Sequence, residues 1–142
     1  TRAAVEEGIV TGGGVALIRA IKCLDKVSGE NEDENLGIQI IKKSLEYPVR
    51  IIAENAGVDG AVVFMETFRK KGGEGYNAKT DKYEDLKKAG VIDPTKVTRI
   101  ALLNAGSIAG MVITTEAVIN DMPEEGPAAP MMPPGGGMGG MM

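Results

Sequence analysis

Three consecutive glycines, Gly12-Gly13-Gly14, separate two amphipathic stretches near the start of the chain. Ordering three glycines costs more backbone entropy than ordering three other residues, so a folded protein keeps such a run where φ is positive or a neighbour approaches closely. Ahead of a helix, that neighbour can be an anion such as phosphate; a flexible joint between helices is the alternative. The run is no Walker A loop, because no Gly-Lys-Ser/Thr follows, and no dinucleotide fingerprint, because no strand is expected before it.

The composition excludes several classes of function. The 142 residues, 43% hydrophobic and 25% charged, are enough for one globular domain with a sizeable core. A net charge of −4 gives no electrostatic footprint for nucleic acid. No signal peptide is visible and no apolar run approaches the length of a membrane span, so we expect neither nucleic acid nor a membrane as a partner. The chain opens on Thr1 rather than Met, and we expect it to be a piece of a longer protein.

Cysteine and histidine usage narrows the chemistry further. Cys23 is the only cysteine, which excludes an internal disulfide and favours a reducing compartment. Histidine is absent, so this segment holds no Ser-His-Asp triad, no Cys-His pair and no histidine-rich metal site.

Apolar periodicity predicts a mostly helical body over residues 1–122. Asn31 with Glu34 resembles a capping box; the acidic run around them could instead hold a metal ion, but helix-start chemistry explains the same residues. Pro48 is expected to break or kink, near Tyr47, the helix that starts after this cap. Asn55-Ala56-Gly57 is expected to end that helix.

The second half of the body is predicted to hold a turn-rich segment and a long helix. A helix is expected over about residues 60–71, and a small charged helix around residues 81–88. From Pro94 a long helix begins, and its many small residues predict that it lies close to another helix at the centre of the core. Residues 117–121 (AVIND) are expected to form a short β-type run.

Residues 123–142 differ in composition from the rest of the chain. They contain five of the seven prolines and five of the eight methionines. Such a segment cannot bury enough apolar surface to offset the entropy of ordering it, so we predict a disordered tail.

Two further stretches could contribute to a binding site. Asn77 with Ala78, in the segment GYNA, could present an amide and backbone groups to a purine edge, or simply form a turn. Asp93, directly before Pro94, could accept hydrogen bonds from a ribose, or act as the N-cap of the long helix.

The order of these stretches resembles the group I chaperonins, the GroEL family. The resemblance rests on five segments that follow the family's order through the body: TRAAVEEGIVTGGGVALIR, NEDENLGIQIIKKSLEYPVR, GYNAKTDKYEDLKKAGVIDPTKVTR, SIAGMVITTEAVIND and a tail rich in Gly and Met. It implies a mostly α fold: the C-terminal half of the chaperonin equatorial helical domain with short β segments over residues 1–122, then the tail over 123–142.

The resemblance also implies an ATP site. By match to the family's motifs, Gly13 would lie against the nucleotide, Asn77 and Ala78 would line the adenine pocket, Val91 would pack on the base, and Asp93 would accept from the ribose hydroxyls. Lys79 departs from the small residue that the family often has there, which puts a side-chain role at that position in doubt.

No catalytic residue and no metal ligand is expected in this segment. The family's phosphate loop and Mg²⁺-binding carboxylate belong to the other half of the domain, and the aspartate that helps activate water would fall a few residues before Thr1. Phosphoryl transfer depends on positioning and metal electrostatics, so the parent subunit would be an ATPase and this segment alone would be inactive.

The partners implied are those of the family. They are identical subunits in two stacked seven-membered rings, a co-chaperonin lid and unfolded client proteins. Arg50 and Asp59 match positions at the contact between rings, and residues 117–121 match a strand that pairs with a neighbouring subunit. The implied location is the bacterial cytoplasm, with the mitochondrial matrix or plastid stroma as alternatives. A different class of function also fits: a helical protein-interaction module that binds no nucleotide.

Overall fold

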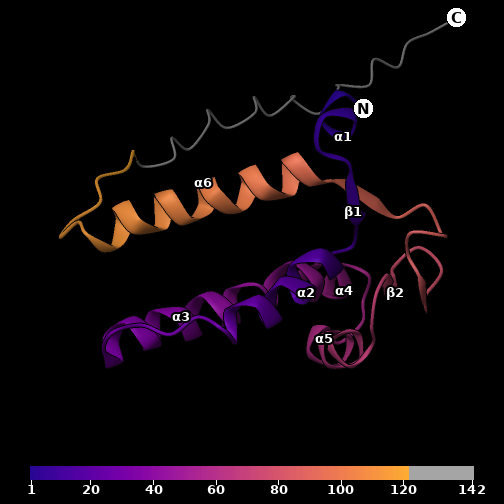
Figure 1. The fold of residues 1–142 in the computed structure, drawn as a ribbon, viewed down its shortest axis with the longest axis horizontal. Coiled ribbons are helices and arrows are strands. Elements are labelled where there is room, and N and C mark those ends of the chain that lie inside the picture. The colour runs from indigo at the N-terminus through magenta and orange to yellow at the C-terminus, as the bar shows by residue number, and fades with distance from the viewer. Residues whose placement is uncertain (122–142) are drawn as a thin grey trace, which may run out of the picture.

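The computed structural model describes residues 1–121, so the predicted tail and its boundary lie outside the described residues. More than half of the described residues are helical, with short strands between the helices, which confirms the mostly α prediction. Figure 1 shows α6 running opposite α2 and α3, with β1 between these two parts of the molecule. The elements in chain order are α1 (Arg2–Glu7), β1 (Ile9–Thr11), α2 (Val15–Leu24), α3 (Glu32–Ser44), α4 (Tyr47–Asn55), α5 (Gly60–Arg69), β2 (Glu74–Asn77), β3 (Lys82–Asp85), β4 (Ile92–Pro94) and α6 (Thr95–Ile113).

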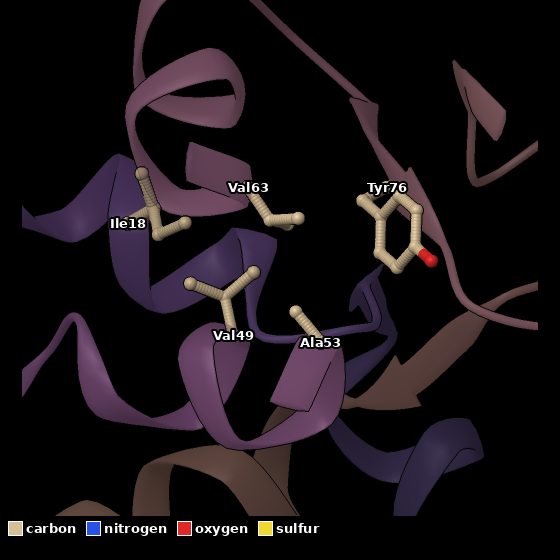
Figure 2. Packing of buried hydrophobic residues seen from close by; sticks show 5 residues of the cluster. All are labelled: Ile18, Val49, Ala53, Val63 and Tyr76. Atoms are coloured by element: carbon tan, nitrogen blue, oxygen red, sulfur yellow. The ribbon is translucent and has the colours of Figure 1, made fainter. Parts of the chain in front are cut away.

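The core lies where α2, α4, α5 and β2 meet. Its five buried members point toward one another across these elements (Figure 2) and are Ile18, Val49, Ala53, Val63 and Tyr76. The side chains of Val58, Phe64 and Phe68 pack against this cluster from partly buried positions. Apolar periodicity therefore gives the buried face of α2, whereas in α5 the apolar Val62 and Met65 are exposed beside the buried Val63.

The helix ends follow the predicted capping chemistry. Asn31 caps α3, because its side chain accepts a hydrogen bond from Glu34 N at 2.9 Å. The chain turns at Leu45 and Glu46, and α4 begins at Tyr47, so Pro48 lies in its first turn and starts a new helix rather than kinking a continuous one. Gly57 has a φ of 79° just after α4 ends, as expected for a helix stop.

Two antiparallel strand pairs were not predicted. The strand β1 pairs with β4, with Val10 opposite Asp93, so a short strand does precede the glycine triplet. The strand β2 pairs with β3 where a small charged helix was expected over residues 81–88; that prediction is wrong. The rings of Tyr76 and Tyr83 lie opposite each other with centroids 5.5 Å apart, and this cross-strand contact overrides the local helical propensity.

The long helix α6 is not part of the core of the described residues, although it was predicted to be central. None of its side chains is buried, because no layer within residues 1–121 covers its apolar side. Residues 117–121 form no strand within the described part of the chain. α6 is held instead at its start by ion pairs from α1: Glu6 with Lys96, and Glu7 with Arg99 at 2.6 Å.

α6 is also long and apolar enough to pass a test for membrane spans, with a mean hydropathy of 1.3, although the sequence suggested no such segment. Length and composition alone are weak evidence, since helices that pack inside water-soluble proteins pass the same test. Within residues 1–121 this apolar surface stays uncovered.

The glycine loop is packed against two other parts of the backbone. A Cβ added to Gly14 would lie 2.8 Å from Val49 N in α4, and one added to Gly12 would lie 3.1 Å from Ile92 N in β4. Gly13 and Gly14 have φ values of 64° and 77°, in the left-handed region that favours glycine. Both reasons for keeping glycines, positive φ and close approach, thus apply here.

Replacing Gly14 with alanine is expected to lower the free energy of unfolding by about 2–4 kcal/mol, because the new Cβ would be strained and would overlap α4. Urea unfolding followed by circular dichroism measures the change. Gly37→Ala in α3 is the matched control, since nothing lies within 4 Å of that position. The control should leave stability unchanged or raise it by up to about 1 kcal/mol. Equal losses in the two variants would contradict the packing argument.

The contact between α1 and α6 is expected to weaken in acid. The Arg99 guanidinium, by hydrogen bond and charge, holds the pKa of the Glu7 carboxyl below its ordinary value. A lowered pKa in the folded state stabilises it at pH values above the ordinary carboxyl pKa of about 4.3, and this is lost as pH falls through the lowered pKa. The protection factors of the α1 amides, which are exchange rates corrected for the intrinsic effect of pH, should fall over that window. In Glu7→Gln this fall should be absent; the same pH dependence of protection in that variant would count against the pair.

Candidate nucleotide-binding site

Gly13 lies beside Val91 and the base of the β2–β3 hairpin. Gly12 N donates a hydrogen bond to Val91 O at 3.0 Å, which fixes the loop on the segment that leads into β4. A Cβ added to Gly13 would lie 3.2 Å from Leu86 Cδ1, 3.8 Å from Tyr76 O and 3.9 Å from Val91 Cγ1. Two of the predicted site residues, Gly13 and Val91, are therefore neighbours in the fold.

Asn77 ends β2 and uses its side chain to shape the turn that follows. Only 7% of the residue is exposed. Its Nδ2 donates to Glu84 Oε1 at 2.7 Å, and its Oδ1 accepts from Lys79 N at 3.1 Å. This is the turn that the sequence allowed as the alternative for Asn77.

Ala78 and Lys79 follow in the turn, and both are exposed. The main chain of Lys79, not its ammonium group, holds the turn by donating to Asn77. The amide of Asn77 keeps one N–H for another acceptor, and Ala78 presents a small apolar surface to solvent. At the end of the hairpin, these two residues thus offer a ligand one amide N–H and one small apolar side chain.

Asp93 lies within β4 and is not the N-cap of α6. The capping position is Pro94, with φ −65° and ψ 128°, so the interpretation of Asp93 as an N-cap is wrong. Pro94 has a φ that suits a helix but an extended ψ, because it still pairs with Ile9 of β1, so the helix begins one residue later than expected. The Asp93 side chain is exposed and remains available for a ligand.

Asp93 also lines a cavity of about 510 Å³ between α2, the α3–α4 junction and α6. Its charge is unmatched among the other lining residues, which are Leu17, Ser44, Leu45, Pro48, Pro94, Val97, Thr98, Ala101, Leu102 and Ala105. The cavity does not reach Gly13, Asn77, Ala78 or Val91. Among the described residues, the predicted site is thus an open surface rather than one enclosed pocket.

Val91 directly precedes β4, and Asp93 lies within it, opposite Val10 of β1. The structure therefore brings Gly13 next to Val91 and Tyr76 O, and it places Asp93 two residues further along the chain, in the lining of the cavity beside α6. Asn77 and Ala78 lie one and two residues beyond Tyr76, at the far end of β2.

Sequence reasoning missed two residues that build this surface. Leu86 is fully buried between Gly13 and Gly75, and its only signal was an apolar residue inside a charged run. Arg19 resembled a surface charge on α2, but its guanidinium donates to three main-chain carbonyls: Gly72 O at 3.1 Å, Thr67 O at 2.9 Å and Glu74 O at 2.8 Å. Burial lowers the pKa of Arg19, partly offset by the charge of Glu74.

The acidic residues of the described part of the chain do not form a metal site. Across residues 1–121, no group of three or more Cys, Asp or Glu side chains gathers closely enough to hold a metal ion. The acidic residues at the start of α3 act as helix-start groups, with Glu34 accepting from Glu30 N at 2.7 Å.

Comparison with known proteins identifies the fold. A family model, the TCP-1/cpn60 chaperonin family, matches residues 1–123. Among solved structures, the chain resembles the open-state monomer of a group II chaperonin from Methanococcoides burtonii, with a TM-score of 0.69 and 25% sequence identity. The match covers 80% of this chain and 30% of that one. Helix content and strand placement match part of a chaperonin equatorial domain, and this chain belongs to the TCP-1/cpn60 chaperonin family.

Proposed function

We propose that this chain is the C-terminal half of the equatorial domain of a group I chaperonin subunit, and that it supplies one side of an ATP site. The observation that carries the proposal is the contact of the glycine loop with the segment that leads into β4, where Gly13 lies beside Val91 and Asp93 follows two residues later, in a member of the chaperonin family. Assignment to group I rests on the motifs TGGGVAL, VIDPTKVTR and ITTE and on the Gly/Met composition of the tail.

The geometry supports a division of roles across this surface. Gly13, with its positive φ and no side chain, would let a phosphate or sugar approach the loop. Val91 and Ala78 would offer apolar contact to the base. The exposed Asp93 carboxylate would accept hydrogen bonds from the ribose hydroxyls.

Hydrolysis would need groups that these residues do not supply. Phosphoryl transfer requires a metal ion on the phosphates and a positioned water, and the Mg²⁺ ligands are proposed to lie in another part of the subunit. The coverage of 30% of the related chaperonin chain supports this view, because most of such a subunit lies outside the matched region. The whole subunit would be an ATPase, and this chain alone would be inactive.

The exposed apolar surface of α6 supports a place inside a larger assembly. Leu103, Ile108 and Met111 are each more than half exposed. We propose that this surface packs against the rest of the subunit, and that the whole protein works as two stacked seven-membered rings with a co-chaperonin lid. Its activity would be to assist the folding of client proteins, in the bacterial cytoplasm.

The same helix surface would serve the alternative, a helical interaction module without nucleotide. The two hypotheses differ at Asp93, whose charge stands alone in its cavity lining and has no role in helix–helix packing. Nucleotide binding is therefore the discriminating measurement.

In the full-length subunit, Asp93→Ala is expected to weaken ATP binding about 10- to 100-fold, the range for losing hydrogen bonds to a charged group. Isothermal titration calorimetry measures the affinity. Asp33→Ala is the matched control, because Asp33 is an exposed acid in the first turn of α3, remote from β4 in the chain. Unchanged affinity in the Asp93 variant would reject the ribose role and favour the interaction module.

Asn77→Asp is expected to reduce ATP affinity about tenfold, because it sets a second carboxylate against Glu84 and distorts the turn that presents Ala78. The double variant Asn77→Asp/Glu84→Gln should restore most of the affinity, since the glutamine amide introduced by the second substitution can donate to the new carboxylate. If the double variant binds as weakly as the single one, the turn is not what Asn77 contributes.

A further inference from the structure

Arg19 makes more hydrogen bonds between separate elements than any other described side chain. It projects from α2 and binds carbonyl oxygens of the last turn of α5, of the loop at Gly72 and of the first residue of β2. We propose that Arg19 is a positioning residue for the nucleotide site, which holds β2 in place against α2 so that Asn77 and Ala78 stay within reach of a ligand at Gly13. This inference rests on the proposed function.

The contacts of Arg19 fix three points on one stretch of chain. Thr67 O is a carbonyl of the last turn of α5, which lacks a partner within its own helix, and a cation there also suits the helix dipole. Gly72 O and Glu74 O bracket the turn that leads into β2. One guanidinium therefore links the last turn of α5 to the first residue of β2.

The helix α2 connects these three hydrogen bonds of Arg19 to the glycine loop. Arg19 lies four residues after Val15, the first residue of α2, a rise of about 6 Å along the helix. Val15 packs over Gly75 so closely that a Cβ at Gly75 would collide with Val15 Cγ2. Just before α2 begins, Gly13 lies against Tyr76 O. β2 is thus held on α2 at Glu74, Gly75 and Tyr76 in succession, just before Asn77.

Arginine suits this role and lysine does not. The guanidinium is planar and presents its N–H groups in a fixed fork, here aimed through Nε, Nη1 and Nη2 at three different carbonyls. A lysine ammonium is a compact group on a flexible stem and would reach only part of this set. The geometry of one side chain therefore fixes the positions of three separate carbonyls.

The three hydrogen bonds of Arg19 lie outside the buried core. The buried cluster of Ile18, Val49, Ala53, Val63 and Tyr76 contains no atom of Arg19. Two of the three bonds, to Gly72 O and Glu74 O, are exposed, so water can solvate these carbonyls when the guanidinium is removed. Loss of Arg19 should free the start of β2 without unfolding the domain.

The test uses the full-length subunit with three variants: Arg19→Met, Arg19→Lys and, as a control with the same loss of charge, Arg69→Met. Arg69 is an exposed residue of α5 that pairs with Glu66 on its own helix. Calorimetry gives the ATP affinity, and hydrogen exchange resolved by residue compares the β2–β3 amides with those of α4 and α5. Asp93→Ala is measured in parallel as the test of the site itself.

We expect Arg19→Met to weaken ATP binding about tenfold and to accelerate exchange in β2 and β3, with α4 and α5 unchanged. Arg19→Lys should be intermediate, and Arg69→Met should bind ATP like the parent. Full ATP affinity in Arg19→Met, with weak binding in Asp93→Ala, would overturn the positioning role alone. Faster exchange throughout the core of Arg19→Met would assign Arg19 a purely structural role and also overturn it. Full affinity in Asp93→Ala would instead reject the proposed site.

Discussion

The close approach of the glycine loop to two other backbones is the contact on which the described fold depends. Gly14 lies against Val49 of α4 with no room for a side chain, and Gly12 lies so close to Val91 and Ile92 that a Cβ there would make tighter contacts than nearly all real ones. The hydrogen bond from Gly12 N to Val91 O continues the pairing of β1 with β4. Since α2 starts at this loop, its direction across α4 and β2, and so the assembly of the core, follows from the same contact.

The structural and the ligand-binding explanations of the glycine triplet are therefore not alternatives. Gly12 and Gly14 are required by packing, and the loop that they permit leaves Gly13 between Val91 and the hairpin. A surface built around β4 arises as a consequence, because β4 carries Asp93 two residues after Val91. The same backbone contact that organises the core brings together residues from distant parts of the sequence.

Sequence reasoning succeeded where structure is decided locally. The cap at Asn31, the helix stop at Gly57 and the inward face of α2 follow from side-chain chemistry within a few residues. It failed for the β2–β3 hairpin, because the pairing of Tyr76 with Tyr83 competes with a local preference for helix. It also failed for β1, whose three residues pair with a strand more than eighty positions away.

In the candidate site, too, local patterns identify residues but do not arrange them. The motifs name Gly13, Asn77, Ala78, Val91 and Asp93, whereas contacts between elements decide their arrangement. Arg19 carried no local signal, since only the tertiary fold turns an ordinary surface arginine into a ligand for three carbonyls. Conversely, Asp93 looked like an N-cap, and the structure moves that role to Pro94.

The exposure of α6 could not be predicted for a different reason. Its pattern correctly gives a long helix, with Ala105, Gly106 and Ala109 on one side, and these residues do face α2 and α3 across a cavity of about 620 Å³. Small residues let helices approach closely, yet α6 stays apart from α2 and α3 and is tied to the fold through Glu6 and Glu7 at its first turns. α6 has a face of small residues beside an open apolar cavity and ion pairs at its first turns. Such a surface is typical of a helix that lies inside a domain. The apolar surface that α6 exposes is thus the feature that the proposed place of this chain within a larger subunit would explain.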